Sequence, residues 1–288
     1  MNNTSKAHLY LIHCHTNMHA GSGDESYGII DKQVQRDSAT GIPCIHASSL
    51  KGALREHFEG KAGYPPKEID DNSGFGYVTE DNMMHIFGTL PNEKDGNNKA
   101  GNYIFFPANL LSIPVRSSYR PYYNATSRLI LEDVFDLNLR MERLLSPSVA
   151  KALKDFNDSQ GSPLIFDGAK HVILESKEAS SYETLEESNL SKVKEWIGEN
   201  PALFSPEDFM ERSNELPVIA RNHLENGISQ NLWYEEVIPR ETRFYCVILS
   251  TPDDKIFELF NNVLTRDLIQ IGANATVGYG YCSFTKLS

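Results

Sequence analysis

The sequence has few of the residues that identify several common classes of protein. Its four cysteines, Cys14, Cys44, Cys246 and Cys282, show no CxxC spacing, which argues against a zinc ribbon or a thioredoxin-like motif. They lie in apolar segments, so we expect buried free thiols in a reducing compartment. No apolar run approaches a membrane span, and residues 9–12 are too few for the apolar region of a signal peptide. These absences predict a cytoplasmic protein without membrane contact.

Basic residues are also few. The 27 Lys and Arg residues are outnumbered by 39 Asp and Glu residues, which gives a formal net charge of -12. Free-standing nucleic-acid binders usually carry a basic surface that releases counterions, so this balance argues against that class. A nucleic-acid site in this chain must therefore concentrate its basic residues on one face. The 288 residues, 40% of them hydrophobic, suffice for one large globular domain or two small ones.

Periodicity and turn residues predict an α+β fold. Two strand-helix groups, one at each end of the chain, enclose a helix-rich middle region, residues 127–212, which is compatible with a ferredoxin-like core carrying an insertion. Asn226-Gly227 predicts a β-hairpin, because Asn-Gly is the strongest short hairpin signal. The expected strands are residues 8–18, 103–106, 171–175, 217–224, 228–236, 244–250 and 281–287, and residues 109–115 lead from the second of them to Arg116. The expected helical pieces are residues 50–58, 193–197, 206–212 and 254–265.

The stretch from Gly21 to Gly52 has the residues of a phosphate-binding site. Glycines allow a ligand to approach the backbone closely. Ser48 and Ser49 are expected to cap a helix over residues 50–58, which begins with Lys51. A capped helix start beside cationic side chains favours phosphate.

Three histidines near the N-terminus suggest a second possibility. His13 and His15 share one face of the predicted strand, and His19 follows. A zinc ion would need further ligands from elsewhere in the chain, which the cysteine spacing does not supply. A metal hydrolase that uses this cluster therefore remains an alternative.

Seven short motifs, spread from one end of the chain to the other, resemble the RAMP superfamily of CRISPR proteins, and within it the repeating backbone subunits of type III-B (Cmr) effector complexes. Each motif is weak alone, but their shared order is specific. The motifs are Gly21-Ser22-Gly23, residues 27–31 (YGIID), residues 48–52 (SSLKG), residues 106–108 (FPA), residues 113–118 (IPVRSS), residues 232–239 (LWYEEVIP) and residues 270–280 (QIGANATVGYG).

The resemblance implies a single RAMP domain over residues 1–288 with a ferredoxin-like (RRM-like) core. Its expected parts are an N-terminal core (1–126), an inserted helical region (127–212), a β-hairpin thumb (213–240) and a C-terminal core with a Gly-rich loop (241–288). In the family, the thumb displaces a base pair, and wedges of this kind exchange stacking energy for a reshaped strand. Here Asn226-Gly227 replaces the family's usual Thr-Gly turn.

The resemblance also implies an RNA-guided endoribonuclease. Several copies, with other Cmr subunits, would bind a CRISPR RNA, and each copy would cut the paired single-stranded target RNA at regular intervals. Base pairing would supply the specificity. The alternative within the same fold is a non-catalytic RNA-binding scaffold.

Asp31 matches the aspartate that the family uses for cleavage. It would bind Mg²⁺ or another divalent metal transiently, or take a proton from an attacking 2′-hydroxyl. Its structural alternative is a turn cap or a pair with Arg36. Glu236 and His19 are secondary catalytic candidates; Glu236 would otherwise pair with Arg240 or Arg243, and His19 would be a packed strand-end residue. Glu235 and Glu236 are expected on opposite faces of their strand.

The remaining candidates are RNA contacts implied by the same resemblance. Lys51 would meet guide backbone, Arg55 shares its helix face, and the Gly-rich loop would hold RNA through its backbone. Arg116 is equally well explained as a surface ion pair, and Trp233 and Tyr234 as packing residues. The predicted RNA-binding residues are Gly21, Ser22, Gly23, Arg36, Ser48, Ser49, Lys51, Arg55, Arg116, Gly272, Asn274, Gly278 and Gly280.

Overall fold

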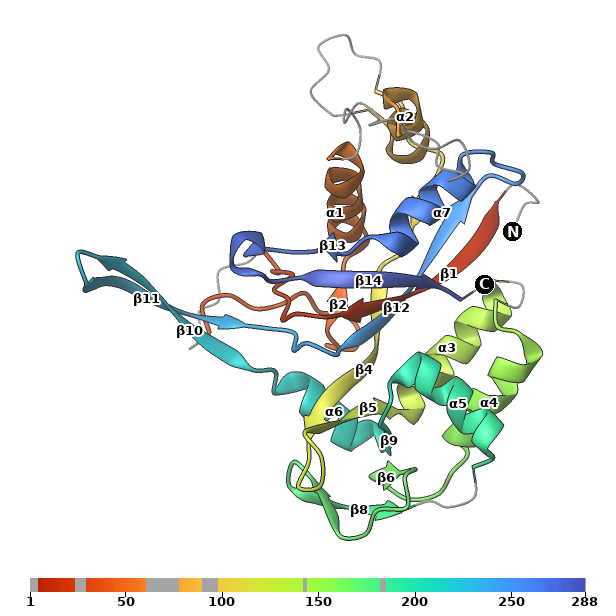
Figure 1. Cartoon of the computed structure of the whole chain (residues 1–288), viewed down its shortest axis with the longest axis vertical. Coiled ribbons are helices and arrows are strands. Elements are labelled where there is room, and N and C mark those ends of the chain that lie inside the picture. The colour runs from red at the N-terminus through yellow and green to blue at the C-terminus, as the bar shows by residue number, and fades with distance from the viewer. Residues whose placement is uncertain are drawn as a thin grey trace.

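The structure is a computed structural model that describes residues 5–23, 30–60, 78–89, 98–141, 144–181 and 185–287. Residues 27–29 of the YGIID motif lie outside the described residues, whereas Ile30 and Asp31 lie within them. Figure 1 shows a sheet that runs through the molecule, helices beside it and one long hairpin that leaves the body.

Four antiparallel strands form the centre of the sheet. They are β1 (Lys6–Cys14), β4 (Ala108–Arg116), β12 (Arg243–Ser250) and β14 (Tyr281–Lys286), in the spatial order β14-β1-β12-β4. Helix α1 (Ala47–Glu59) lies between β1 and β4 in the chain, and helix α7 (Phe257–Arg266) lies between β12 and β14. This order is that of a ferredoxin-like fold, which confirms the predicted core.

Apolar packing on both faces holds this core together. Residues 9–12 of β1 are all buried, as the unbroken apolar run predicts. On the helical face, Phe58 of α1 stacks on Phe260 of α7 with ring centroids 5.3 Å apart, so the two helices meet over the sheet. The four cysteines are free thiols and are buried, and the sulfur atoms of Cys14 and Cys282 lie 3.6 Å apart.

The inserted region extends the sheet beyond β4. The second half of β4 pairs with β5 (Tyr122–Ser127), which pairs in parallel with β9 (Pro201–Phe204). The sheet continues through β6 (Leu164–Ile165), β8 (Lys177–Ser181) and β7 (Val172–Leu174). Four helices accompany these strands, which confirms the helix-rich middle. The strand expected over residues 171–175 is present as β7, and the sheet contains further short strands that the sequence did not predict. The helices are α3 (Arg128–Arg140), α4 (Pro147–Asn157), α5 (Glu187–Ile197) and α6 (Pro206–Asn214).

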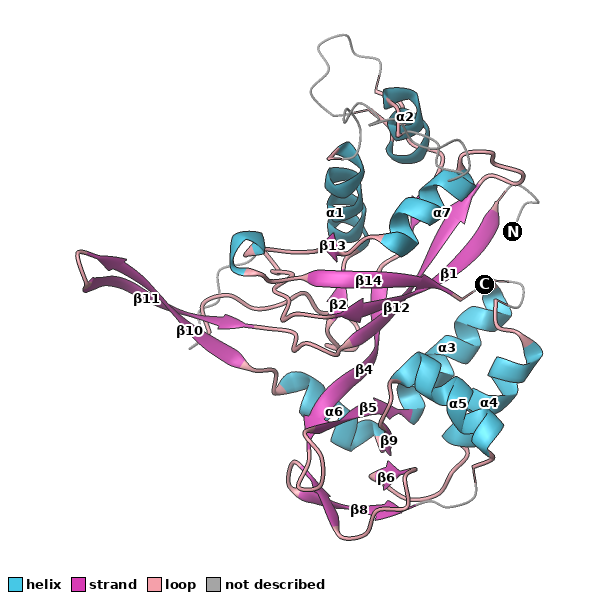
Figure 2. Ribbon diagram, viewed as in Figure 1, coloured by secondary structure: helices cyan, strands magenta, loops and turns pink. Residues whose placement is uncertain are grey.

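Local sequence explains where three of these helices begin. Ser127, Ser146 and Ser205 each precede a helix, and each side chain accepts a hydrogen bond from an N–H group of the first turn. Proline occupies the first helical position of α4 and α6, where its missing N–H group is not needed. Figure 2 shows that α3 to α6 gather at one end of the molecule and α1, α2 (Glu80–Phe87) and α7 at the other.

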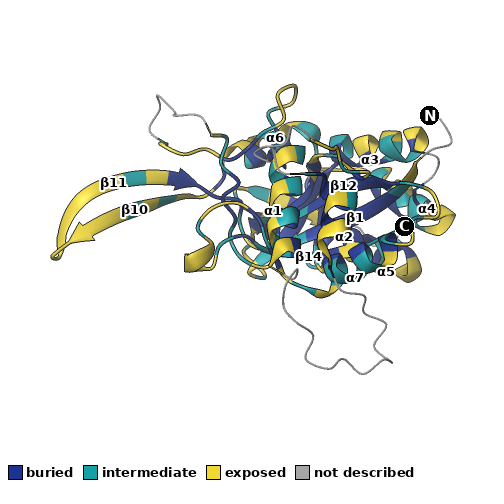
Figure 3. Cartoon of the chain, turned by 90° about the horizontal axis from the view of Figure 1, so that it is seen from above, coloured by how far each residue is buried: buried dark blue, intermediate teal, exposed yellow. Residues whose placement is uncertain are grey.

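The predicted hairpin is present. Strands β10 (Val218–Glu225) and β11 (Ile228–Glu236) are joined by Asn226 and Gly227, both with positive φ, as an Asn-Gly turn requires. The two strands form a separate sheet that projects from the body (Figures 1 and 3). Leu224, Ile228 and Leu232 are 53–65% exposed, so the outer hairpin carries apolar surface without a core of its own.

Short elements complete the described fold. They are β2 (Cys44–Ile45), β3 (Ile104–Phe105), β13 (Ile269–Gln270) and the 3-10 turn η1 (Ala275–Val277). Strand β3 is shorter than the expected strand 103–106. None of the helices in the described ranges is long and apolar enough to cross a membrane.

Candidate functional site

Three segments that are far apart in the sequence meet at the foot of the hairpin. Met18 pairs with Ile238, His19 with Ala273, and Lys32 with Glu235, each as a backbone bridge. The segment after β1, the end of β11 and the Gly-rich loop after β13 are therefore in contact. We call this meeting point the hairpin junction, defined by residues 18–23, 30–36, 233–238 and 271–280. Most of the predicted site residues lie in it.

Asp31 is exposed at the edge of the hairpin. Its Oδ2 accepts a hydrogen bond of 2.7 Å from the backbone N–H of Tyr234. The backbone N–H groups of Asp31 and Lys32 both donate to the Tyr234 carbonyl, each at 3.1 Å. The carboxylate is thus fixed by the hairpin and still faces solvent. The alternative that it pairs with Arg36 is wrong, because Arg36 binds Glu236.

Glu236 and Arg36 form a partly buried ion pair behind this edge. Arg36 Nη2 donates to Glu236 Oε1 at 2.6 Å, and the N–H of Val34 donates to Oε2 at 3.0 Å. Arg36 Nη1 donates to the carbonyls of Gly41 and Ser213, both at 3.0 Å. Neither of the partners expected for Glu236, Arg240 or Arg243, is the one observed. The structure uses Glu236 and Arg36 to hold the junction, and their predicted roles in catalysis and RNA binding stay predictions.

Glu235 lies on the opposite face of β11 from Glu236, as strand alternation predicts. Its side chain is 2% exposed and accepts hydrogen bonds from four donors. Burial opposes its ionisation, but hydrogen bonds from Trp233, Lys32 and Asn274 outweigh burial and lower the pKa of Glu235 to about 2. The donors are Lys32 Nζ (3.2 Å), Arg221 Nε (3.1 Å), Trp233 Nε1 (2.8 Å) and Asn274 Nδ2 (3.0 Å).

His19 is buried inside the junction. Its Nδ1 donates to the Glu236 carbonyl at 2.7 Å, which leaves Nε2 beside Gly21. A Cβ atom at Gly21 would lie 3.1 Å from His19 Nε2, and one at Gly272 would lie 2.4 Å from the His19 carbonyl oxygen. These two glycines therefore allow His19 to pack, in agreement with the expectation of a packed strand-end histidine. A role for His19 in cleavage stays a prediction.

The Gly-rich loop folds back on itself. Gly278 has a φ of +82°, and a Cβ atom there would meet no other atom within 4 Å, whereas a Cβ atom at Gly280 would lie 2.0 Å from the Ile271 carbonyl oxygen. Asn274, with a φ of 67°, turns its amide towards Glu235. Of the predicted RNA contacts in this loop, Gly278 is the one with open space around it. In the Gly21-Ser22-Gly23 motif, the backbone N–H of Ser22 donates a hydrogen bond to the Gln33 carbonyl, and Gly23 is exposed.

The expected serine caps of helix α1 are wrong. The helix begins at Ala47, after His46, so Ser48 and Ser49 lie in its first turn. Gln35 explains the earlier start, because its Oε1 accepts from the His46 N–H at 2.7 Å and its Nε2 donates to Ser49 Oγ at 2.7 Å. The candidate phosphate surface therefore adjoins the junction through Gln35, while Ser48 stays exposed.

The two cationic side chains of α1, Lys51 and Arg55, differ in how far their charged groups are engaged by other protein groups. Lys51 Nζ lies 5.8 Å from the centroid of the Phe105 ring, and burial, followed by the nearby Arg55 charge, lowers the pKa of Lys51. Arg55 is bound by Glu59 at 2.7 Å and by the Gly88 carbonyl at 3.1 Å. Lys51 is thus the better placed of the two to receive a phosphate.

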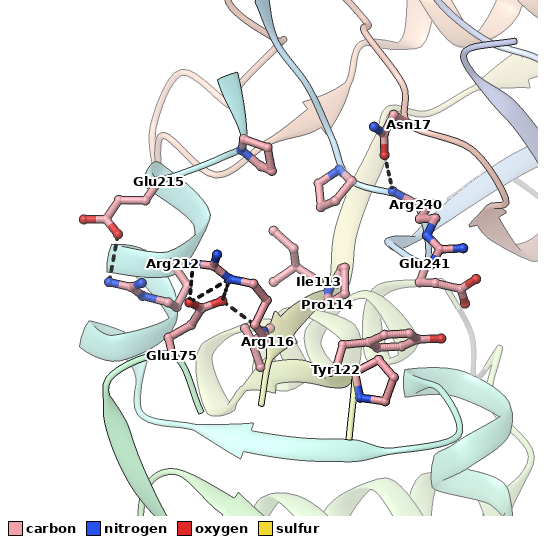
Figure 4. Close-up of a pocket in the computed structure, with 14 residues that line it drawn as sticks. Asn17, Ile113, Pro114, Arg116, Tyr122, Glu175, Arg212, Glu215, Arg240 and Glu241 are labelled. Atoms are coloured by element: carbon pink, nitrogen blue, oxygen red, sulfur yellow. Dashed lines mark hydrogen bonds and ion pairs between the residues drawn. The ribbon is translucent and has the colours of Figure 1, made fainter. Parts of the chain in front are cut away.

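Arg116 forms a surface ion pair, as its structural alternative predicts. Its side chain is 88% exposed, and its Nη2 donates to Glu175 Oε2 at 2.9 Å. Both residues line a groove of about 520 Å³ at the side of the hairpin foot (Figure 4). In that groove Arg212 also pairs with Glu215, at 2.9 Å, so both signs of charge are present.

The histidines do not gather as metal ligands. His13 Nε2 binds Glu241 at 3.0 Å, His15 Nε2 binds Ser283 at 2.8 Å, and His19 is engaged within the junction. In the parts of the chain that the structure describes, no group of three or more His, Cys, Asp or Glu side chains is placed to hold a metal ion. The metal-hydrolase alternative therefore lacks its ligand set there.

Sequence reasoning missed the network around Glu235. Lys32 and Arg221 have no motif of their own, and the sequence pattern gives Trp233 a packing role alone. The hairpin register could have predicted this network, because it places Arg221 opposite Trp233 and Ile219 opposite Glu235 on one face of the hairpin.

The sequence also matches a known protein family and one of its members. A family model described as the RAMP superfamily matches residues 11–283. The Cmr endoribonuclease Cmr4 of the CRISPR system of Pyrococcus furiosus is 30% identical over 300 residues, which cover 97% of this chain and 95% of that protein.

Solved structures show the same fold at lower identity. A type III-B Cmr-beta complex bound to cognate target RNA contains a chain with a TM-score of 0.75 and 22% identity, covering 98% of this chain and 97% of that one. Oligomeric Cmr4 from Pyrococcus furiosus matches with a TM-score of 0.66 and 23% identity, covering 98% and 99% of the two chains.

Proposed function

We infer the function from one premise: the chain belongs to the RAMP superfamily. We propose that it is a CRISPR RNA-binding backbone subunit of a type III-B effector complex, which cleaves guide-paired target RNA at regular intervals. Its partners are the CRISPR RNA, the target single-stranded RNA, other copies of itself and other Cmr subunits. The buried free thiols fit a reducing, cytoplasmic location.

The observation that carries the proposal is the placement of Asp31. Its carboxylate is exposed, fixed by the Tyr234 N–H, and lies where the hairpin meets the body. An RNA strand that passes the foot of the hairpin would meet this carboxylate. Exposed apolar side chains further along the hairpin, such as Leu232, suit insertion between base steps.

The reaction that suits one carboxylate is attack of a ribose 2′-hydroxyl on the adjacent phosphorus. Asp31 would accept the hydroxyl proton as the new O–P bond forms, and the 5′-oxygen of the next nucleotide would leave. Much of the rate would come from holding the strand in line for this attack, because a lone carboxylate supplies limited acid-base catalysis. The hydrogen bonds that tie Asp31 to the hairpin would supply this positioning.

A divalent metal is part of the proposal. Mg²⁺ is commonly bound through one or two carboxylates together with substrate phosphates and waters. Asp31 is an exposed carboxylate and fits that mode, with RNA phosphates completing the ligand set, while Glu235 and Glu236 are committed to cations of the protein. When bound, the metal would stabilise the charge that develops on the phosphate.

Guide binding is assigned to the surface that adjoins the junction. Lys51 lies one helical turn after the exposed Ser48 in helix α1, and its ammonium group lies over the Phe105 ring. The open space around Gly278 would admit a sugar-phosphate backbone. These contacts read backbone and shape, as expected where base pairing supplies the sequence specificity.

The test is target-RNA cleavage by the guide-loaded complex, with wild type compared with Asp31→Asn, with and without Mg²⁺. Loss of the regular cuts in Asp31→Asn, with target binding retained, is the expected result. A 2′-deoxy substitution at the cut should also abolish cleavage if the 2′-hydroxyl attacks. Unchanged cutting by Asp31→Asn would overturn the assignment of Asp31 and favour the scaffold alternative.

A further inference from the structure

Glu235 connects three of the four segments of the hairpin junction to one another and to the facing hairpin strand β10. Its four donors come from the segment that carries Asp31 (Lys32), from both hairpin strands (Arg221 and Trp233) and from the Gly-rich loop (Asn274). These segments are widely separated in the sequence. A single buried carboxylate therefore fixes the position of each segment relative to the others.

The contacts around this carboxylate are dense. Lys32 Nζ also lies 5.3 Å from the centroid of the Trp233 ring, and the Arg221 guanidinium lies 4.6 Å from the centroid of the Tyr279 ring. Each cation is thus held by a charged acceptor and by an aromatic face, in the range of cation–π contacts. Hydrogen bonds to charged groups are the stronger kind, and removing a buried partner leaves the remaining charges uncompensated.

The network is adjacent to the proposed catalytic group. Lys32 follows Asp31 directly, and Tyr234, whose N–H binds the Asp31 carboxylate, lies between Trp233 and Glu235. Both residues that flank Tyr234 and the residue after Asp31 therefore belong to one network. A shift of this network would move the Asp31 carboxylate relative to the hairpin that positions the RNA.

We propose that Glu235 is a positioning residue for RNA cleavage: from inside the protein it holds the Asp31 segment, the hairpin and the Gly-rich loop in the one arrangement that presents Asp31 to the strand. This inference rests on the proposed function. Glu235 does not touch RNA and acts through Lys32 and Tyr234. Misplacement of a reacting group by about 1 Å can lower a rate by about 100-fold.

The test is single-turnover cleavage by the assembled, guide-loaded complex carrying Glu235→Gln. This substitution keeps the shape of the side chain and removes its charge. We expect the maximal cleavage rate to fall at least about tenfold, while the target concentration for half-maximal rate changes by less than about twofold. The matched control is Asp208→Asn in helix α6, which removes a carboxylate that binds Lys177 and Ser162 in the inserted region. It should lower stability without changing the cleavage rate.

A double mutant separates positioning from stability. Lys32→Met should slow cleavage, and adding Glu235→Gln to it should slow the reaction little further, because both changes break the same contact. If Glu235→Gln prevents assembly, Asn274→Gly removes one donor and tolerates the positive φ at that position. That variant should also lower the maximal rate.

The outcomes distinguish the two proposals. If Asp31→Asn abolishes cleavage and Glu235→Gln and Asn274→Gly cleave at the wild-type rate, the positioning role is wrong and the proposed function stands. The role is also overturned if the effects of Lys32→Met and Glu235→Gln simply add. If Asp31→Asn cleaves normally, the assignment of Asp31 fails first.

Discussion

Gly272 and Gly278 offer a matched pair for testing which glycines of the Gly-rich loop serve packing. Both have positive φ, +87° and +82°, so alanine at either position meets the same backbone penalty. That penalty is about 1–2 kcal/mol for an L-residue in the left-handed region. At Gly272 a Cβ atom would also lie 2.4 Å from the His19 carbonyl oxygen, whereas at Gly278 it would meet nothing within 4 Å.

We therefore expect Gly272→Ala to lower the free energy of unfolding by about 2 kcal/mol or more beyond the loss in Gly278→Ala, because overpacking typically costs about 1–3 kcal/mol and here the neighbour is backbone. Urea unfolding followed by circular dichroism would measure both losses, with m-values compared to check two-state behaviour. Equal losses in the two variants would refute the reasoning, since the close contact with His19 would then have no cost. RNA affinity should respond in the opposite way: for the same loss of unfolding free energy, Gly278→Ala should weaken RNA binding more than Gly272→Ala.

Three further predictions concern charge, RNA contact and the core. Burial, with lesser effects of Lys286 and Lys6, lowers the pKa of His8 to about 4, against about 6.5 in an unfolded chain. Between these two pH values the unfolded chain binds one more proton at this histidine than the folded chain does, so the free energy of unfolding should fall as the pH drops from 7 to 4.5. Urea unfolding of His8→Gln should show a less steep fall over the same pH range. Lys51→Met should weaken RNA binding and reduce the slope of log K against log salt by about 0.7, the value for one contact to a single strand; an unchanged slope would remove Lys51 from the RNA surface. Phe58→Ala should lower the free energy of unfolding by about 3–5 kcal/mol, because it opens a cavity against Phe260; a loss below about 1 kcal/mol would mean that the helices repack.

Much of the fold could be predicted because its signals are local. The Asn226-Gly227 turn determines its own geometry, and the apolar run in β1 follows from burial on both faces. The ferredoxin-like order follows from strand-helix groups at the two ends of the chain. The short strands β6, β8 and β9 escaped prediction, because strands of two to five residues have no periodicity of their own and form by pairing with neighbours, as β6 does with β8 and β9.

Sequence motifs single out the candidate site residues, but they do not predict which groups those residues contact. Asp31 is identified by its motif, but its partner, the backbone of Tyr234, is set by the approach of two distant segments. The predicted start of helix α1 is wrong for the same reason, since Gln35 reaches the helix from another segment. Contacts of this kind depend on tertiary structure, and neither helix propensity nor spacing contains them.

The neighbouring positions of β1 and β14 have a consequence for protein synthesis. These strands are far apart in the sequence, yet they pair directly, and β12, the other neighbour of β1, also comes much later than β1. Because a chain emerges from the ribosome N-terminal end first, β1 lacks both of its neighbours until β12 and β14 have been made. The junction, which needs the Gly-rich loop just before β14, forms at the same late moment. A nascent chain in which β14 has not yet been made therefore lacks a complete hairpin junction, and with it the RNA site proposed there.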